Sequence, residues 1–247
     1  MRVDVSLFSS ESIPKDLARL LVVVVDVLRA TSTISTALAN GCEEVIPTES
    51  IEEAIKIARG YARPDYVLGG ERRGVAVEGF DLGNSPQEYT PEKVAGRKVI
   101  ITTTNGTRAI KEYSGAREIF TACFLNADAV FDACAACPDS DVLIVCSGQD
   151  GRFCMEDTIC AGLLASRFGR ELGADVSDAA RAASILYERC EASIETELFR
   201  SEHGAYLAGI GFEQDVTYCS QRSVMSVVPK VYDRRVIRRA LQAQRGE

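Results

Sequence analysis

The segment that decides the fold is Leu21-Val22-Val23-Val24-Val25-Asp26-Val27-Leu28-Arg29-Ala30-Thr31-Ser32-Thr33. Four consecutive valines are typical of a strand that is buried on both faces, as in the interior of a parallel sheet. An aspartate ends this run, and an arginine with three hydroxyl residues then opens a helical pattern. Ligands of open parallel sheets bind at the carboxyl ends of strands, where loops turn into helices. The segment therefore places Asp26 and Arg29 where a site would lie, while capping of the helix by Asp26 and Thr31 is the alternative.

Strand patterns and helix patterns alternate along the rest of the chain, with short connections between them. Further buried strands are expected at Lys98–Thr102 and Asp141–Cys146, each followed by a helix. This alternation predicts an α/β fold with three layers, α/β/α, around a mostly parallel sheet. We expect residues 1–247 to form a single domain, and the pattern leaves open whether its halves are two subdomains.

Two other regions carry structural predictions. Residues 75–91 lack periodicity and are dense in turn formers, which is typical of an ordered loop that covers a site. Further along the chain, we expect a mostly helical region at 177–200, a turn at 201–204 and a strand within 224–231.

The composition is that of a globular protein, with 46% hydrophobic residues and a net charge of −8. No basic stripe could follow a phosphate backbone, which argues against nucleic-acid binding. The arginine pairs at 234–235 and 238–239 are expected on one solvated face of a helix. No apolar run approaches the roughly 20 residues needed to span a membrane. The N-terminus alternates like a strand and unlike a signal peptide, so we expect a cytoplasmic protein.

The nine cysteines are expected to be small, buried hydrophobic residues. Their number is odd, which argues against disulfides in a cytosolic protein. The single C-x-x-C pair, Cys134 and Cys137, has no second pair at zinc-finger spacing and no histidine near it. A structural role is therefore favoured over zinc binding.

Three buried strands end in polar loops that each open a helix, at 26–33, 102–107 and 146–157. Backbone N–H groups and hydroxyls of such loops bind anions, so three converging loops could hold a substrate with two anionic groups. Carboxylates are expected at the same edge of the sheet, and Asp150 is a less favoured member of this set than Asp26, Glu71, Glu156 and Asp157. Clustered carboxylates without histidine suit Mg²⁺. Mg²⁺ with arginine and hydroxyl groups is typical of phosphoryl chemistry.

Two phosphatase signatures can be compared with these loops. A strand that ends in aspartate is typical of haloacid-dehalogenase phosphatases, but their second acidic residue is replaced here by Leu28. The segment from Cys146 to Arg152 has the C-x5-R spacing of cysteine-dependent phosphatases. Val145 replaces the usual preceding histidine and Asp150 adds a negative charge to the loop, so a nucleophilic Cys146 is the less favoured alternative.

A larger set of motifs resembles one known family, that of 2-phosphosulfolactate phosphatase (ComB). These motifs, in an order and spacing that cover nearly the whole chain, are Asp26-x-x-Arg29-Ala30-Thr31-Ser32-Thr33, Gly70-Glu71-Arg72, Gly79-Phe80-Asp81-Leu82-Gly83-Asn84-Ser85-Pro86, Thr103-Thr104-Asn105-Gly106-Thr107, Cys146-Ser147-Gly148, Glu156-Asp157-x-x-Cys160-Ala161-Gly162 and Ser201-x-His203-Gly204. The resemblance implies a Mg²⁺-dependent hydrolase that converts (R)-2-phospho-3-sulfolactate to 3-sulfolactate and phosphate, a step of coenzyme M biosynthesis. It also implies an α/β fold of two similar subdomains.

These considerations give a working hypothesis for the site. Mg²⁺ is held by some of the carboxylates Asp26, Glu71, Glu156 and Asp157, binds a phosphate oxygen and orients the attacking water. The catalytic residues are Asp26, Arg29 and Glu156. The substrate-binding residues are Arg29, Thr31, Thr33, Arg72, Asn105, Gly106, Thr107, Ser147, Gly148 and His203, the only histidine, for which a capping role is the alternative. A non-catalytic binder of small dianionic metabolites is the second functional hypothesis, and a homodimer is the working assumption for the assembly.

Overall fold

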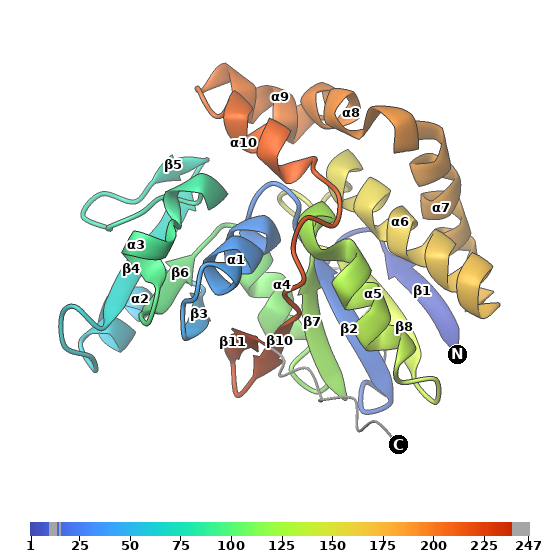
Figure 1. The fold of residues 1–247 in the computed structure, drawn as a ribbon, viewed down its shortest axis with the longest axis horizontal. Helices are drawn as coiled ribbons and strands as arrows, with labels where there is room; N and C mark the ends of the chain where they lie inside the picture. Colours follow the sequence, from blue (N-terminus) through green and yellow to red (C-terminus); the bar gives the residue numbers. More distant parts are fainter. Residues whose placement is uncertain (10–13, 15, 239–247) are drawn as a thin grey trace.

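A single mixed sheet of 11 strands forms the centre of the protein (Figure 1). The computed structural model describes residues 1–9, 14 and 16–238. The strands are β1 (Arg2–Ser6), β2 (Leu20–Val25), β3 (Glu44–Thr48), β4 (Tyr66–Arg72), β5 (Val75–Ala76), β6 (Lys98–Thr102), β7 (Glu118–Ala122), β8 (Asp141–Cys146), β9 (Asp175–Val176), β10 (Pro229–Tyr232) and β11 (Arg235–Arg238). Their order in the sheet is β5-β4-β6-β3-β11-β10-β7-β2-β8-β1-β9.

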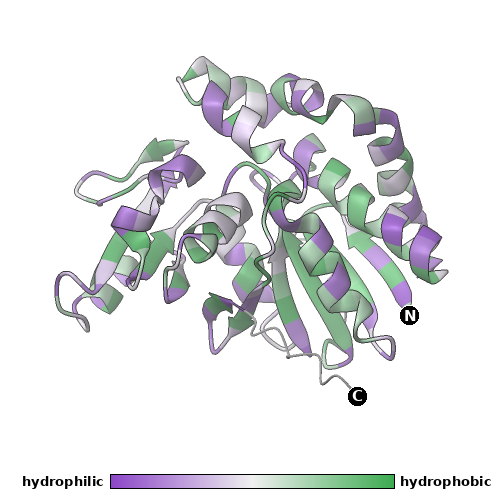
Figure 2. Ribbon diagram, viewed as in Figure 1, coloured by the Kyte–Doolittle hydropathy of each residue, from purple (hydrophilic) through white to green (hydrophobic). Residues whose placement is uncertain are grey.

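Helices cover both faces of this sheet, which confirms the α/β fold. They are α1 (Ala30–Ala39), α2 (Ile51–Ala58), α3 (Pro91–Val94), α4 (Gly106–Glu112), α5 (Ala127–Ala135), α6 (Met155–Leu172), α7 (Asp178–Cys190), α8 (Ile194–Arg200), α9 (Glu202–Gly209) and α10 (Glu213–Cys219). Figure 2 shows the apolar strands enclosed by helices whose outer faces are polar. In the described part of the chain, no helix is long and apolar enough to cross a membrane.

The valine run of β2 is buried on both faces, as the sequence predicts. Val23 and Val25 pack into one apolar cluster with side chains of α5 and α6. Val22 and Val24 point the other way, into a second cluster with side chains of α1 and α4. Burial of each valine stabilises the folded state by roughly 1.5–3 kcal/mol. Strand β2 therefore holds the start of the loop at Asp26 in a fixed position.

The sheet consists of two parallel blocks joined by a hairpin. Strands β4, β6 and β3 are mutually parallel, as are β7, β2, β8, β1 and β9. The β10–β11 hairpin lies between the blocks and is antiparallel to both of its neighbours, β7 and β3. The two blocks therefore run in opposite directions along the hydrogen-bonded sheet. In a flat sheet their carboxyl ends would lie at opposite edges.

Twist of the sheet brings those ends together. Neighbouring strands rotate by roughly 20–25° relative to each other, and five steps separate β6 from β2 in the strand order. The accumulated rotation of about 100–125° turns both sets of carboxyl ends toward the same region, above the hairpin in Figure 1. The sequence analysis expected the site at one edge of a parallel sheet, and that expectation was wrong: two blocks contribute.

The C-terminal region also differs from the prediction. Arg235–Arg238 is strand β11, in place of the expected helix face, and Arg239 lies outside the described residues. The alternation explains this, since Val236 is buried against Val45 of β3 while Arg235 pairs with Glu44 at 3.0 Å. The strand expected within 224–231 begins only at Pro229.

Three further regions can be compared with the sequence analysis. The expected turn at 201–204 is the start of α9, where the Gly204 N–H donates to Ser201 Oγ at 3.0 Å. Helix α6 begins at Met155, so Glu156 and Asp157 lie in its first turn. The aperiodic region 75–91 is ordered, with the short strand β5 and a 3₁₀ turn at Pro86–Glu88.

The cysteines and the surface complete the description. All nine cysteines except Cys137 are buried, as small core residues are expected to be.

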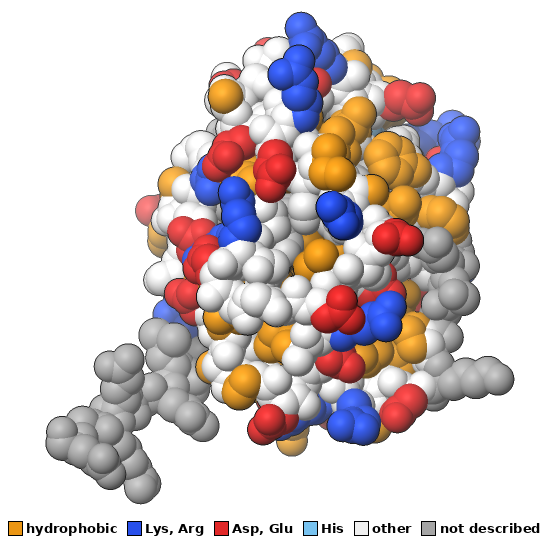
Figure 3. Space-filling model, turned by 90° about the vertical axis from the view of Figure 1, so that its right-hand side faces the viewer, with side chains coloured by type: hydrophobic (Ala, Val, Ile, Leu, Met, Phe, Trp, Pro, Cys, Tyr) orange, Lys and Arg blue, Asp and Glu red, His pale blue; other side chains and the backbone are white. Residues whose placement is uncertain are grey.

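Figure 3 shows the side of the molecule on which α7 lies, where acidic and basic side chains are intermixed and apolar side chains lie between them.

Candidate active site

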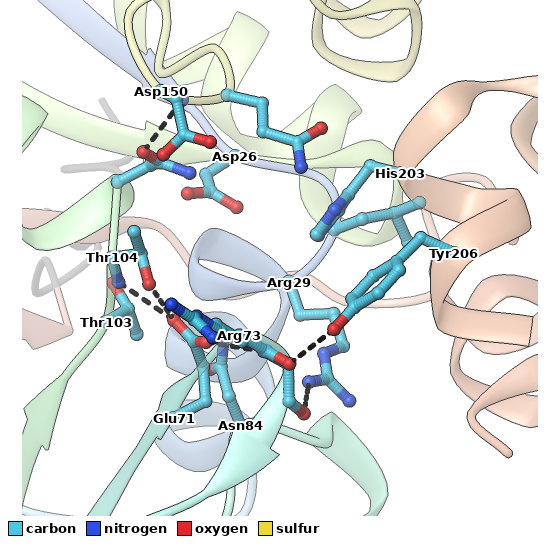
Figure 4. A pocket seen from close by; sticks show the side chains of 14 residues that line it. Asp26, Arg29, Glu71, Arg73, Asn84, Thr103, Thr104, Asp150, His203 and Tyr206 are labelled. Carbon is cyan, nitrogen blue, oxygen red and sulfur yellow. Dashed lines mark hydrogen bonds between the residues drawn. The ribbon is translucent and has the colours of Figure 1, made fainter. Parts of the chain in front are cut away.

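A small cavity lies where the carboxyl ends of β2, β4, β6 and β8 meet, and α9 covers it (Figure 4). Its volume is about 180 Å³, below the roughly 300–1,000 Å³ of sites for drug-sized ligands. It is lined by Asp26, Leu28, Arg29, Glu71, Arg73, Gly74, Asn84, Thr103, Thr104, Asn105, Gln149, Asp150, His203 and Tyr206. The size suits a ligand of a few carbon atoms.

Asp26 follows β2 directly and its carboxylate faces this cavity (Figure 4). Asp26 Oδ1 accepts the Ala30 N–H at 3.0 Å. Burial raises the pKa of Asp26 to about 7, and the nearby charges of Glu71 and Glu156 act in the same direction. A carboxyl group with this pKa can gain and lose a proton near neutral pH, as a general acid or base must.

Two predicted binding residues shape the surroundings of Asp26 instead of facing the cavity. The buried Thr31 hydroxyl lies 2.7 Å from the Ala122 carbonyl oxygen and 2.8 Å from that of Asp26, which fixes the turn after β2. Gly106 brings its backbone against Asp26, because a Cβ atom there would lie 2.6 Å from Asp26 Oδ2. Only glycine permits this close approach.

The loop after β6 is held by its own contacts and by Glu71. Glu71 Oε1 accepts the Thr104 N–H at 2.8 Å and the Thr104 hydroxyl at 2.9 Å, while Oε2 accepts the Gly74 N–H at 2.8 Å. The buried Thr107 hydroxyl donates to the Thr103 carbonyl oxygen at 3.1 Å. Glu71 thus joins the β4–β5 turn to the loop that packs on Asp26.

Of the two arginines after Glu71, the structure places the second in the cavity. Arg72 points to the other side, where its Nη2 donates to Thr102 Oγ1 at 3.0 Å. Arg73 lines the cavity, and Figure 4 shows its side chain extending toward Thr104. Arg73 follows the last residue of β4 and has a φ of 52°, so the β4–β5 turn directs its side chain away from that of Arg72.

Arg29 lines the cavity but its charge is already paired. Its Nη1 donates to Asp215 Oδ2 at 2.5 Å and its Nη2 to the Gly74 carbonyl oxygen at 2.6 Å. The guanidinium also lies 4.3 Å from the centre of the Phe212 ring. Asp215 and Phe212 are 186 and 183 residues from Arg29 in sequence, so the local sequence around Arg29 does not predict these contacts.

Glu156 and Asp157 lie behind the cavity and do not line it. Asp157 accepts the Val27 N–H at 2.8 Å and the Gly148 N–H at 3.2 Å, which joins the loops after β2 and β8. Burial raises the pKa of both carboxyls, and the charge of Asp26 adds to the shift of Asp157. Glu156 Oε2 and the Ser147 hydroxyl are buried without a hydrogen-bond partner among the described residues.

The 79–86 loop contributes a residue that the sequence analysis did not assign. Asn84 lines the cavity, and its side-chain Oδ1 is buried without a hydrogen-bond donor in the described structure. Its backbone carbonyl accepts the buried Thr33 hydroxyl at 2.8 Å. Thr33 therefore positions Asn84. The sequence signals for this residue were the turn formers of the loop and its place in the Gly79–Pro86 motif of the family resemblance.

His203 and Tyr206 form the roof of the cavity from α9 (Figure 4). Their rings are stacked, with centres 6.2 Å apart. Burial lowers the pKa of His203, and the positive charge of Arg29 lowers it further, so the imidazole is neutral at neutral pH. On the opposite wall, the Asp150 N–H donates to Asn105 Oδ1 at 3.3 Å, and both residues line the cavity.

Comparison with known proteins identifies the family. The family model described as 2-phosphosulpholactate phosphatase matches residues 7–234. The chain belongs to the 2-phosphosulfolactate phosphatase family. Proteins named "Probable 2-phosphosulfolactate phosphatase" are similar to it in Caldanaerobacter subterraneus subsp. tengcongensis (39% identity over 88% of this chain and 90% of the relative), Symbiobacterium thermophilum (40%, over 90% and 96%) and Thermotoga petrophila (43%, over 84% and 87%). The family is one of phosphoric monoester hydrolases.

Within this member of the family, Cys146 is part of the core and not of the cavity. It packs with Ile144 in the cluster beneath α6. Gln149 and Arg152 exchange two backbone hydrogen bonds of 3.0 Å, which closes the C-x5-R segment into a tight turn. A phosphate cradle around the sulfur would need those N–H groups to face Cys146, so the geometry does not support a cysteine nucleophile.

The expected metal ligands fall into two sets. Asp26 and Glu71 line the cavity, whereas Glu156 and Asp157 lie behind it, and the described residues contain no group of three His, Cys, Asp or Glu placed to hold a metal ion. Mg²⁺ in phosphoryl-transfer sites commonly uses one or two carboxylates together with waters and substrate oxygens. The partnerless Asn84 Oδ1 beside the Glu71 carboxylate offers such an oxygen set (Figure 4).

Proposed function

We propose that this protein hydrolyses (R)-2-phospho-3-sulfolactate to 3-sulfolactate and phosphate in a Mg²⁺-dependent reaction of coenzyme M biosynthesis. The observation that carries the proposal is Asp26, a carboxyl group whose pKa is raised to about 7 and which faces a small cavity. The family supports the substrate class, since the matched model and the relatives carry the name of this phosphatase.

The charge balance of the cavity supports the proposed dependence on Mg²⁺. Its lining has three carboxylates, Asp26, Glu71 and Asp150, and two arginines, of which Arg29 is neutralised by Asp215. A ligand with phosphate, carboxylate and sulfonate groups is strongly anionic, so its binding here needs further positive charge. Mg²⁺, held by Glu71 and Asn84 Oδ1, would supply that charge at the phosphate oxygens.

Each residue of the cavity has its own role in the hydrolysis. Asp26 Oδ2 accepts the proton of the attacking water while the water oxygen bonds to phosphorus and the ester P–O bond breaks. The leaving oxygen of the hydroxy acid takes a proton from a water molecule enclosed in the cavity. The backbone N–H groups of Asn105 and Gly106, at the start of α4, hold phosphate oxygens, while that of Thr104 is bound to Glu71. The neutral His203 closes the roof and excludes bulk water. Glu156 and Asp157 support Asp26 from behind, in place of the direct roles expected for them.

Phosphate release tests this proposal directly. We expect turnover of (R)-2-phospho-3-sulfolactate with Mg²⁺ and its loss in EDTA, with recovery when excess Mg²⁺ is added. Circular dichroism in EDTA serves as the control that the protein stays folded. Turnover that survives EDTA contradicts the metal, and saturable binding of the substrate without phosphate release would leave the non-catalytic binder as the function.

A further inference from the structure

The mouth of the cavity is formed by those of its lining residues that are exposed to solvent. They are Arg73, Thr104, Asp150 and Tyr206, and the other lining residues are buried or half-buried. Of these four, Tyr206 contributes an aromatic ring, which is large and rigid, whereas the other three side chains are small or open-chain. A ligand that enters the cavity therefore passes beside the ring of Tyr206.

The Tyr206 side chain is held at two points. Its ring stacks on that of His203, with the ring centres 6.2 Å apart, and its hydroxyl donates to the Arg73 carbonyl oxygen at 2.9 Å. The turn that carries this carbonyl is itself fixed, because the carbonyl oxygen of the next residue, Gly74, accepts a hydrogen bond from Arg29 at 2.6 Å. The ring is therefore kept in one position between α9 and the β4–β5 turn.

Helix α9 and the β4–β5 turn are in direct contact beside this ring. A Cβ atom added at Gly74 would lie 3.0 Å from Ile210 Cδ1 and 3.4 Å from both Leu207 Cδ2 and Tyr206 Cε1. Gly74 also has a φ of 76°, in the left-handed region that favours glycine. The backbone of the turn thus packs closely on the helix, and the width of the mouth on this side is determined by the Tyr206 side chain.

The groups assigned to the chemistry lie away from this ring. Asp26 is buried, and Figure 4 shows it on a different side of the cavity from Tyr206. The phosphate has to reach Asp26 and the N–H groups of Asn105 and Gly106, so the alcohol part of a phosphomonoester extends toward the mouth. In a cavity of about 180 Å³, a short carbon chain fits behind the ring of Tyr206, whereas a bulky group would need the space that this ring occupies.

We propose that Tyr206 is a specificity-determining residue, whose ring restricts the site to phosphomonoesters of a few carbon atoms and excludes aryl phosphates and nucleotides. This rests on the proposed function for the hydrolysis of a phosphate ester. The selection is by size, so it does not depend on which small hydroxy acid carries the phosphate.

Kinetics with a small and a bulky phosphomonoester test this role. We expect Tyr206→Ala to raise the ratio of kcat/KM for phenyl phosphate to kcat/KM for 2-phospholactate by about 10- to 100-fold, the range in which a pocket discriminates between substrates of different size. Tyr206→Leu should raise this ratio less. Tyr206→Phe keeps the ring and should stay within about threefold of the wild-type ratio. An unchanged ratio in the alanine and leucine variants, or an equal rise in the phenylalanine variant, overturns the proposal.

The matched control is Tyr232→Ala, which removes an exposed tyrosine from β10, outside the cavity lining. This variant should keep the wild-type ratio, and circular dichroism checks that each variant is folded. A rise in Tyr232→Ala equal to that in Tyr206→Ala would also overturn the proposal.

A binding experiment separates failure of this inference from failure of the proposed function. Calorimetry with Mg²⁺ present measures the affinity of wild type and Tyr206→Ala for methylphosphonate and phenylphosphonate, whose C–P bonds a phosphatase does not hydrolyse. Wild type should bind methylphosphonate at least about tenfold more tightly than phenylphosphonate, and the variant should lose most of this preference. This result would uphold the role of Tyr206 even if wild type released no phosphate from any ester. The same preference in both proteins, or none in wild type, overturns it.

Discussion

At the scale of single residues, Asp26 combines a chemical role with a cost in stability. Its carboxyl is buried beside Glu71 and Glu156, and burial raises its pKa to about 7 from the ordinary value of 3.8. A carboxyl whose pKa is higher in the folded state than in the unfolded state disfavours folding once the unfolded chain ionises. Below pH 4 the Asp26 carboxyl is protonated in both states and does not lower the free energy of unfolding. As the pH rises from 4 to about 7, burial of this carboxyl lowers the free energy of unfolding progressively.

This reasoning predicts the stability of Asp26→Asn. In EDTA at pH 8 we expect the variant to be more stable than wild type, by up to about 4 kcal/mol for a shift of this size. The difference should shrink as the pH falls toward 4, because the wild-type carboxyl is then protonated in both states. Urea unfolding at several pH values measures it. A variant less stable than wild type at pH 8 would contradict the assigned cause of the shift.

The sequence placed Asp26, Arg29, Glu71, Asn105 and His203 in one site, and all five line the cavity. It missed other residues of the site for physical reasons. A buried strand ending in aspartate is a local pattern, so β2 and Asp26 could be found. Arg72 was chosen over Arg73 because the sequence does not show that β4 continues through Gly69 and Gly70 to Arg72 and that the turn begins only at Arg73. Asp215 was missed because its contact with Arg29 spans 186 residues.

At the scale of elements, α10 is tied to the cavity through Asp215. This carboxylate is buried, pairs with Arg29 at 2.5 Å and accepts the Ser85 hydroxyl at 2.5 Å. It therefore connects α10, the loop after β2 and the 79–86 loop that carries Asn84. Helix α9, which carries His203, packs beside α10, so the same contact holds the roof in place.

Removal of this carboxylate should be costly. We expect Asp215→Ala to destabilise the protein by about 3–5 kcal/mol, because it leaves Arg29 buried without a counter-charge. Asp215→Glu keeps the charge and should be milder. Thermal unfolding of both variants and of Asp178→Ala, an exposed acidic residue at the start of α7, gives the comparison. Equal stability of Asp215→Ala and Asp178→Ala would refute the role of the ion pair.

At the scale of the whole molecule, the hairpin β10–β11 determines where the site forms. It joins two parallel blocks that run in opposite directions, and the accumulated twist turns their carboxyl ends toward each other. The alternation of strands and helices predicted the parallel strands that make up the blocks. It could not predict the hairpin between them, because β11 pairs with β3 across nearly 200 residues and only Val236 and Val45 are in register. The two similar subdomains and the homodimer remain predictions.

The most direct measurement of the central claim is phosphate release by Asp26→Asn from (R)-2-phospho-3-sulfolactate with Mg²⁺. Loss of a positioned general base typically lowers the rate by about 10²–10⁴-fold, and we expect a loss of at least that size in a variant that is folded by circular dichroism. Turnover within a few-fold of wild type would contradict the assignment of Asp26 as the residue that accepts the proton of the attacking water.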